Sequence, residues 1–255
     1  MRIVLRAAPY SILARDYDSV LGLDHFRRVR ALFEHLVREL GLHFSSAADV
    51  GCGTGLFARH LRHRWRVPVF AVDRSPAMLR VARRNCCGSG VHLLQQDFRL
   101  LRLPMPVDLI TATFDTVNHL VAREDLVRAL RCIADNLRPG GHFIFDFLTN
   151  CQLLASSQPY ILRHRGVGGE VQQWIRWDPT RQMLSMRMVQ GFPSLPAPSI
   201  ELHNERAHSP EEMGHALKHA GLIVRKVLDG ATLRPADTCT PRLVVVAQKP
   251  FTGRP

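Results

Sequence analysis

Three glycines in the stretch Asp49–Gly55 are the residues of this sequence best suited to holding a ligand. They stand at alternate positions in D-V-G-C-G-T-G, after a short apolar run and before the segment Leu56–Leu61. Glycine has no Cβ, so it tolerates a positive φ and lets another molecule lie against the backbone. The turn leads into an expected helix N-terminus, where unpaired N–H groups favour an anionic or polar guest. We therefore expect a cofactor to lie on Gly51 to Gly55.

Two carboxylates accompany this turn. Asp49 precedes the first glycine, and Asp73 ends a second apolar run, Val67–Val72, at a distance where a carboxylate can accept hydrogen bonds from ribose hydroxyls. The spacing Gly-x-Gly-x-Gly differs from the Gly-x-Gly-x-x-Gly of dinucleotide-binding proteins. The alternative is a structural glycine turn with an unrelated surface Asp. The agreement of the glycines, the two acids and the strand–helix context favours a nucleoside-containing cofactor.

The stretch Asp49–Gly55 and the acidic strand end at Asp73 resemble the first motifs of class I S-adenosylmethionine-dependent methyltransferases. The resemblance implies an enzyme with S-adenosyl-L-methionine as cofactor, and it assigns Asp97, with Phe98, to the adenine. It also places the region after Thr113 nearest the methyl group. The residues expected to contact the cofactor are Tyr17, Asp49, Gly51, Cys52, Gly53, Asp73, Arg74, Met78, Asp97, Phe98, Thr113 and Phe114.

The order of the apolar segments fits the α/β fold that the resemblance implies. We expect a doubly wound, mostly parallel, seven-stranded Rossmann-like sheet with an antiparallel last strand. Apolar residues at helical spacing, among them Phe26, Phe33 and Leu36, predict the first helix. The expected strands cover residues 46–50, 67–72, 91–95, 107–113, 142–147, 222–228 and 243–248. The expected helices cover residues 24–40, 56–64, 76–86, 124–137 and 210–220.

Residues 148–208 have a different character. The helical period weakens, and alternating patterns over 171–178, 182–189 and 200–207 predict strands. We expect a small antiparallel β insertion after strand five that covers the substrate. The expected division is an N-terminal lid segment (1–22), a cofactor-binding core (23–147 and 209–250) and the insertion (148–208).

Catalytic residues are harder to identify, because the cofactor supplies the reactive group. His119 follows strand four and could take a proton from an amine or a hydroxyl if its pKa is near neutrality. Asn118 could orient a polar group of the substrate, and Tyr17 lies in the expected lid. Tyr10 and Tyr17 are about two helical turns apart and could share a face. The alternatives are a His119 bonded to backbone and tyrosines that only pack.

Residues of the insertion are the remaining candidates for the substrate site. Together with Tyr10 and His119, we predict that Trp174, Arg206 and His208 bind the substrate. Arg206 and His208 alternate with Glu205 and Ala207, so the two pairs should lie on opposite faces of a strand. A structural salt-bridge cluster and ordinary packing of Trp174 are the alternatives.

Composition limits the other function classes. A chain of 255 residues suits one α/β domain with an insertion. No apolar run is long enough for a membrane span, so no membrane partner is expected. The six cysteines lack metal-ligand spacing, so we expect no metal, reduced thiols and a cytoplasmic location. The net charge of +12 leaves nucleic acid open as a partner, although all but three of the basic residues are arginines scattered along the chain.

The leading hypothesis is therefore a methyltransferase that acts on N or O of a small-molecule acceptor, as a monomer or homodimer. An RNA methyltransferase is the first alternative, but Thr113–Thr116 lacks the Asn/Asp-Pro-Pro-Tyr signature of base-amino methylation. A non-catalytic S-adenosylmethionine-binding protein is the second, because a binding motif does not prove turnover. The glycine spacing disfavours a dinucleotide oxidoreductase.

Overall fold

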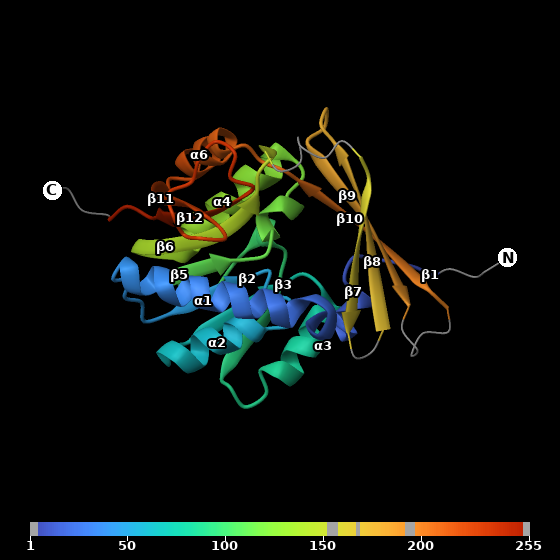
Figure 1. Ribbon diagram of the computed structural model, residues 1–255. Helices are drawn as coiled ribbons and strands as arrows, with labels where there is room; N and C mark the ends of the chain where they lie inside the picture. Colours follow the sequence, from blue (N-terminus) through green and yellow to red (C-terminus); the bar gives the residue numbers. More distant parts are fainter. Residues whose placement is uncertain (1–4, 152–157, 167–168, 192–196, 252–255) are drawn as a thin grey trace.

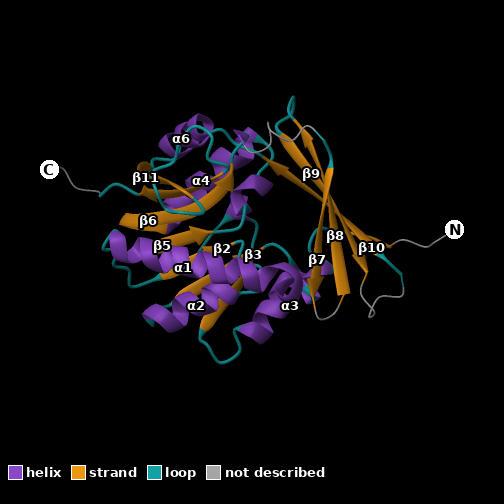
Figure 2. Cartoon of the chain, in the orientation of Figure 1, coloured by secondary structure: helices purple, strands orange, loops and turns teal. Residues whose placement is uncertain are grey.

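Two β-sheets organise the computed structural model, which describes residues 5–151, 158–166, 169–191 and 197–251. A larger sheet lies between two layers of helices, and a smaller sheet stands beside this sandwich (Figures 1 and 2). The N-terminal segment runs between the two, because it contributes a strand to the smaller sheet and then enters the first long helix.

The larger sheet has seven strands. They are β2 (Ala47–Val50), β3 (Val69–Asp73), β4 (Val91–Gln95), β5 (Val107–Ala112), β6 (Leu137–Leu148), β11 (Ile223–Asp229) and β12 (Arg242–Gln248). Their order is β11-β12-β6-β5-β2-β3-β4, and only β12 runs antiparallel to its neighbours. The predicted doubly wound, mostly parallel sheet with an antiparallel last strand is confirmed. One difference is that β6 begins at Leu137 rather than at His142, because backbone hydrogen bonds with Lys249 hold Gly140 and Gly141 to the sheet.

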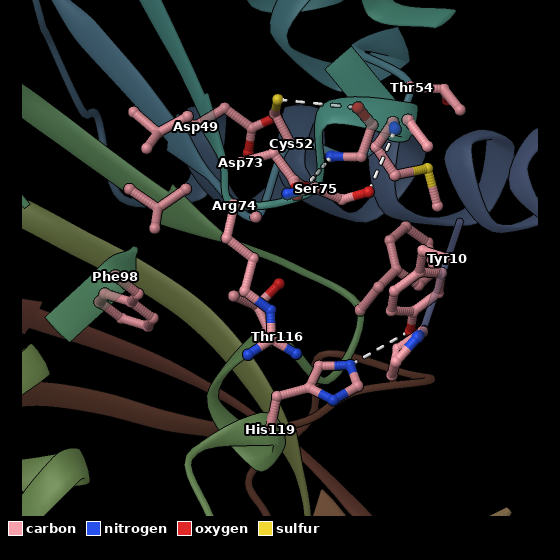
Figure 3. Close-up of a pocket in the computed structure, with 18 of the residues that line it drawn as sticks. Tyr10, Asp49, Cys52, Thr54, Asp73, Arg74, Ser75, Phe98, Thr116 and His119 are labelled. Carbon is pink, nitrogen blue, oxygen red and sulfur yellow. Dashed lines mark hydrogen bonds between the residues drawn. The ribbon is translucent and has the colours of Figure 1, made fainter. Parts of the chain in front are cut away.

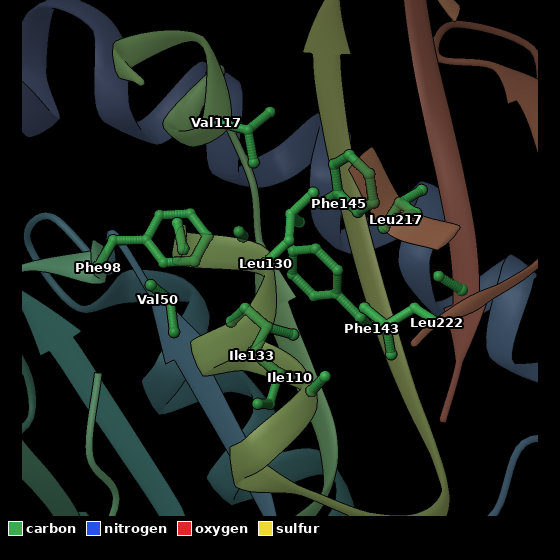
Figure 4. Close-up of a cluster of buried hydrophobic side chains, with 14 of the residues drawn as sticks. Val50, Phe98, Ile110, Val117, Leu130, Ile133, Phe143, Phe145, Leu217 and Leu222 are labelled. Carbon is green, nitrogen blue, oxygen red and sulfur yellow. The ribbon is translucent and has the colours of Figure 1, made fainter. Parts of the chain in front are cut away.

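Helices cover both faces of this sheet. They are α1 (Leu23–Glu39), α2 (Leu56–Trp65) and α3 (Pro76–Asn85) on one face, and α4 (Arg123–Asn136) and α6 (Pro210–His219) on the other. Because both faces are covered, successive strand residues such as Phe143 and Ile144 are all buried, in separate clusters. Figure 4 shows the cluster under α4 and α6, where Phe143 and Phe145 stack and Leu130, Ile133 and Leu217 pack around them.

The smaller sheet forms from the predicted insertion and from the N-terminus. Its strands are β1 (Leu5–Ala7), β7 (Tyr160–Gly166), β8 (Gly169–Asp178), β9 (Met183–Gly191) and β10 (Ser199–Arg206), in the order β1-β10-β9-β8-β7. Strands β7 to β10 are antiparallel, which confirms the predicted antiparallel insertion, whereas β1 pairs parallel to β10. The sequence did not predict β1 or β7. Leu13, Val20 and Leu21 of the N-terminal segment pack on Val171 and Met188 of this sheet.

The helices are those of a globular α/β core. In the part of the chain that the structure describes, no helix is both long enough and apolar enough to span a membrane. Ser75 caps α3 by accepting a hydrogen bond from the Met78 amide, and Pro76 occupies the first turn. The N-terminus of α3 is thereby fixed next to the end of β3, where the site lies.

Candidate functional site

A cavity of about 630 Å³ lies at the carboxyl ends of β2, β3, β4 and β5 (Figure 3). The strand order reverses between β2 and β5, which is where open α/β sheets bind their ligands. The volume falls within the range of small-molecule sites. The cavity is lined by every residue that we assigned to the cofactor, namely Tyr17, Asp49, Gly51, Cys52, Gly53, Asp73, Arg74, Met78, Asp97, Phe98, Thr113 and Phe114.

The glycine turn has the backbone that its sequence predicts. Gly51, Gly53 and Gly55 have φ values of 71°, 53° and 79°, in the left-handed region that favours glycine. A Cβ on Gly51 would stand 2.4 Å from Oγ1 of Thr116, whereas nothing lies within 4 Å of a Cβ on Gly53. Gly51 therefore permits close packing inside the protein. Gly53 leaves open backbone in the cavity, as a ligand that lies along this turn requires.

Gly51→Ala is expected to cost more than Gly53→Ala, although both residues have a positive φ. In both variants the strained backbone lowers the free energy of unfolding by about 1 kcal/mol or more. Only Gly51→Ala also displaces Thr116, so we expect at least ~1 kcal/mol of additional loss in the free energy of unfolding. Urea denaturation of the two variants measures the difference. Gly41→Ala, at an open helix end with φ 57°, is the matched control for strain alone. Equal losses of free energy of unfolding in all three variants would contradict the packing role of Gly51.

Asp73 is held in place by the turn on one side and by α3 on the other. Its Oδ2 accepts a hydrogen bond of 2.8 Å from the Gly53 amide, and its Oδ1 accepts one of 2.8 Å from the Ser75 amide. Burial raises the pKa of Asp73, and these two hydrogen bonds act against that rise. Each carboxylate oxygen keeps a free lone pair, so the fixed group can accept hydrogen bonds from two neighbouring hydroxyls. These residues fit the ribose of the expected cofactor.

Asp49 and Asp97 differ from Asp73 in their surroundings. Asp49 is buried below the turn, where desolvation raises its pKa to about 7 and Oγ1 of Thr111 donates a hydrogen bond of 2.9 Å. Asp97 lines the cavity, but Arg99 donates to both of its oxygens and keeps its pKa below the ordinary value. Arg99 also bonds Asp125. No pattern in the sequence indicates this Arg99 bridge, and the adenine role of Asp97 stays a prediction.

Tyr10, Tyr17 and His119 meet at the other end of the cavity. The Tyr10 hydroxyl lies 3.1 Å from Nε2 of His119 (Figure 3). The rings of Tyr10 and Tyr17 make an edge contact with their centroids 6.2 Å apart. The two tyrosines do not share the face of one helix, since a turn and a 3₁₀ segment separate them. Burial lowers the pKa of His119 to about 4, so its imidazole is neutral near pH 7. The expected pKa near neutrality was wrong.

Asn118 has a structural role instead of the predicted role in orienting a substrate. Its side chain is fully buried, its Nδ2 donates to the carbonyl oxygens of Leu148 and Arg206, and its Oδ1 accepts from the Leu148 amide. The amide group is occupied by backbone and does not line the cavity. Asn118 therefore ties the segment before His119 to β6 and β10.

The three substrate candidates of the insertion also lie away from the cavity. Trp174 is 46% exposed on the outer face of β8, because the alternation of the strand turns Gln173 and Ile175 inward. Arg206 and His208 lie within 3.0 Å and 3.7 Å of carboxylate oxygens of Glu212. These contacts support the alternative of a structural salt-bridge cluster for this pair, and the exposed Trp174 does not line the cavity.

A buried ion cluster fixes the loop between β5 and His119. Phe114 and Asp115 have φ values of 61° and 59°, and the Phe114 amide donates to Oδ1 of Asp146 at 2.7 Å. Arg242, at the start of β12, donates to both oxygens of Asp115 and to Asp146. The sequence analysis missed this cluster. Its members are far apart in the chain and carry no motif.

Asp18 is a further residue that the sequence analysis did not assign. Its Oδ1 accepts a hydrogen bond of 2.5 Å from Oγ1 of Thr54, and its Oδ2 accepts one of 2.8 Å from the side chain of Asn85. Thr54 belongs to the glycine turn and Asn85 ends α3. The carboxylate therefore fastens the N-terminal segment over the turn. In the sequence, the position of Asp18 directly after Tyr17 was the feature that could have indicated this role.

Comparison with known proteins shows that this chain is similar to methyltransferases. Residues 47–141 match the model of a methyltransferase domain family. The chain is 32% identical over 137 residues to a dTDP-3-amino-3,6-dideoxy-alpha-D-glucopyranose N,N-dimethyltransferase of Streptomyces fradiae, which covers 52% of each protein. It is 31% identical over 118 residues to a ubiquinone biosynthesis O-methyltransferase of Xanthomonas euvesicatoria, covering 45% of this chain and 48% of that protein. The chain thus spans about half the length of these curated relatives.

A solved structure extends the likeness over nearly the whole chain. A crystal structure of an S-adenosylmethionine-dependent methyltransferase from Clostridium acetobutylicum superposes with a TM-score of 0.81, at 23% identity, over 94% of this chain and 99% of that one. At this identity the superposition establishes the fold. The match over residues 47–141 contains the glycine turn, Asp73, Asp97 and the loop that carries His119.

Proposed function

We propose that this chain is a class I S-adenosylmethionine-dependent methyltransferase and that it transfers a methyl group to a nitrogen or oxygen of a small molecule. The observation that carries the proposal is the Asp73 carboxylate, held by the Gly53 and Ser75 amides at the rim of an open glycine turn. The names of the relatives support both nitrogen and oxygen as the methylated atom. The acceptor itself is a small molecule in this proposal.

The residues of the chain have separate tasks in such a reaction. S-adenosylmethionine supplies an electrophilic methyl group on a sulfonium when it is bound. The protein therefore has to hold the cofactor, orient the acceptor and exclude water. Gly51, Cys52 and Gly53 would hold the methionine part, and Asp73 the ribose. Asp97, Phe98 and Met78 would enclose the adenine. In the proposed division of the chain, residues 1–22 form the lid and Asp18 fastens it.

The acceptor would lie at the end of the cavity formed by Tyr10, Tyr17 and His119. A neutral imidazole can accept a hydrogen bond from the acceptor or from the Tyr10 hydroxyl. Burial also raises the pKa values of both tyrosines, so their hydroxyls stay protonated and can donate. We therefore assign His119 and Tyr17 to the catalytic end and Tyr10 to contact with the substrate.

Isothermal titration calorimetry of the full chain with S-adenosylmethionine and with NAD tests the proposal. We expect one S-adenosylmethionine site per chain and no heat from NAD. The second arm incubates the protein with labelled cofactor and a panel of amino sugars, phenols and bulk tRNA. Label is expected in a small amine or alcohol. Binding of NAD without S-adenosylmethionine, or label only in tRNA, would overturn the proposal.

A further inference from the structure

Glu205 lies behind His119, outside the lining of the cavity. It is on β10, is 5% exposed, and its Oε1 lies 3.7 Å from Nε2 of His119. The same nitrogen lies 3.1 Å from the Tyr10 hydroxyl, which lines the cavity. Tyr10, His119 and Glu205 therefore form a chain of groups that leads from the cavity into the protein. This series of groups includes the Glu205 carboxyl group, to which the proposed methyl transfer has so far given no role.

We propose that Glu205 receives the proton that the methyl acceptor gives up, after Tyr10 and His119 have carried it from the cavity. The inference rests on the proposed methyl transfer and adds the destination of the proton. Glu205 acts through His119 and does not touch the acceptor, so it is a positioning residue in this reaction.

A comparison with Glu201 shows what is unusual about Glu205. Glu201 is four residues earlier on the same face of β10, and it accepts hydrogen bonds from the Tyr10, Ile12 and Leu13 amides. With a further bond from His203, these hold the pKa of Glu201 below its ordinary value. Among the described residues, none donates a hydrogen bond to the carboxyl group of Glu205. Glu201 is thus a saturated structural carboxylate, whereas Glu205 remains able to take a proton.

The charges around Glu205 favour its protonated form. Desolvation raises its pKa well above the ordinary value, Asp115 and Asp146 raise it further, and Arg242 acts in the opposite direction. Arg242 already donates hydrogen bonds to both aspartates, so its positive charge acts on three carboxyl groups at once. Tyr10 and Tyr17 face the same carboxyl group, and its charge contributes to their raised pKa values.

The imidazole of His119 cannot keep the proton in these surroundings. Burial lowers its pKa to about 4, and the charges of Arg74 and His203 act in the same direction, whereas Asp115 and the backbone of Asn204 act against them. A proton that reaches His119 therefore passes on to Glu205, which leaves two neutral groups. Neutral partners are favoured over an ion pair in a desolvated site.

The transfer balances without any further reactant. The N–H or O–H bond of the acceptor breaks, and its electron pair stays on the acceptor atom. The oxygen of Tyr10 takes this proton while its own hydroxyl proton moves to Nε2 of His119. The new Nε2–H bond then breaks as an O–H bond forms at Oε1 of Glu205. The gap of 3.7 Å has to shorten for the last transfer, as catalytic hydrogen bonds often do when substrate is bound. Water takes the proton from Glu205 before the next turnover.

NMR titration of the histidine rings tests the pairing of Glu205 with His119 without an acceptor. The full chain is labelled at histidine, with and without S-adenosylmethionine, and a His119→Asn variant assigns the signal. We expect the His119 signal to show an inflection well above pH 4.3, the ordinary value for Glu, as Glu205 ionises. The inflection should vanish in Glu205→Gln and persist in Glu39→Gln, which changes an exposed residue on α1. Identical curves in wild type and Glu205→Gln would overturn the inference.

Turnover gives the second readout, for any acceptor that the wild-type protein methylates. Glu205→Gln is expected to lower kcat about 100-fold, with KM nearly unchanged, and to remove the acidic limb of the pH profile. A merely structural role would lower kcat without changing the profile, and that result would also overturn the inference. If Glu205→Gln does not fold, Glu205→Asp, which withdraws the carboxyl group, should weaken the inflection. Failure of the protein to bind S-adenosylmethionine would refute the proposed function, while the titration would still decide the pairing.

Discussion

Asp73→Ala is expected to weaken the binding of S-adenosylmethionine by at least ~100-fold. In the proposed function the substitution would remove hydrogen bonds from two ribose hydroxyls to a carboxylate, and such charge-assisted bonds contribute about 1.5–3 kcal/mol each. It also frees the Gly53 and Ser75 amides that the carboxylate holds, so the turn and the start of α3 lose a common support. Calorimetric titration at one salt concentration measures the loss.

Two further variants separate ligand contact from folding in this experiment. Asp135→Ala changes an exposed carboxylate on α4 and should bind S-adenosylmethionine as the wild type does. Asp73→Asn keeps the volume and one acceptor oxygen, so its loss should be intermediate. Unchanged affinity in Asp73→Ala would remove Asp73 from the cofactor site and place the ribose elsewhere.

Arg242→Met is expected to cost about 3 kcal/mol in the free energy of unfolding at pH 8, because it leaves Asp115 and Asp146 without their cation. The estimate is at the low end for a broken buried pair, since the Arg242 side chain is 33% exposed. The loop of Phe114 and Asp115, which is held in a left-handed conformation, loses its anchor to β12. Methyl transfer should therefore fall together with stability.

The effect of Arg242→Met should depend on pH with a defined sign. Burial already raises the pKa of Asp146 to about 6 in the wild type, and loss of the guanidinium raises it further. A carboxyl group with a raised pKa in the folded state contributes stability at low pH and loses it as the pH rises through that pKa. The destabilisation should therefore be smaller at pH 5 than at pH 8. Chemical denaturation at both values measures it.

Arg181→Met is the matched control for this series. Its guanidinium is 81% exposed and lies 3.9 Å from Asp178, so the loss should stay within about 0.5 kcal/mol at both pH values. An Arg242→Met variant as stable as the wild type at pH 8 would contradict the role of the cluster.

Elements with strong local signals were predictable. The strands of the larger sheet and the glycine turn follow from apolar segments and from three glycines that take positive φ, whereas the antiparallel last strand was implied by the family resemblance. Asp73 lines the cavity because a residue that directly ends a parallel strand reaches the carboxyl edge of the sheet, and its assignment to the ribose stays a prediction. The short strand β1 was missed, since three residues carry too little pattern and depend on pairing with β10.

Side chains whose role depends on distant partners were assigned less well. Asn118 was predicted to face the substrate, but backbone groups of Leu148 and Arg206 occupy its amide. Trp174 was placed in the substrate site, yet nothing in the sequence fixes which face of an inserted strand turns inward. A shift by one residue reverses every side chain of a strand, so only the packed sheet decides such an assignment.

The sequence by itself determined the glycine turn and the place of Asp73 beside it, because the turn, Asp73 and their spacing lie within one βαβ unit whose geometry is local. The tertiary structure alone decided what surrounds His119. Tyr10, Glu205 and Arg242 reach that region from the N-terminus, the insertion and the last strand. Their pKa values and hydrogen bonds follow from burial and proximity, which arise only when segments remote in the chain are packed together.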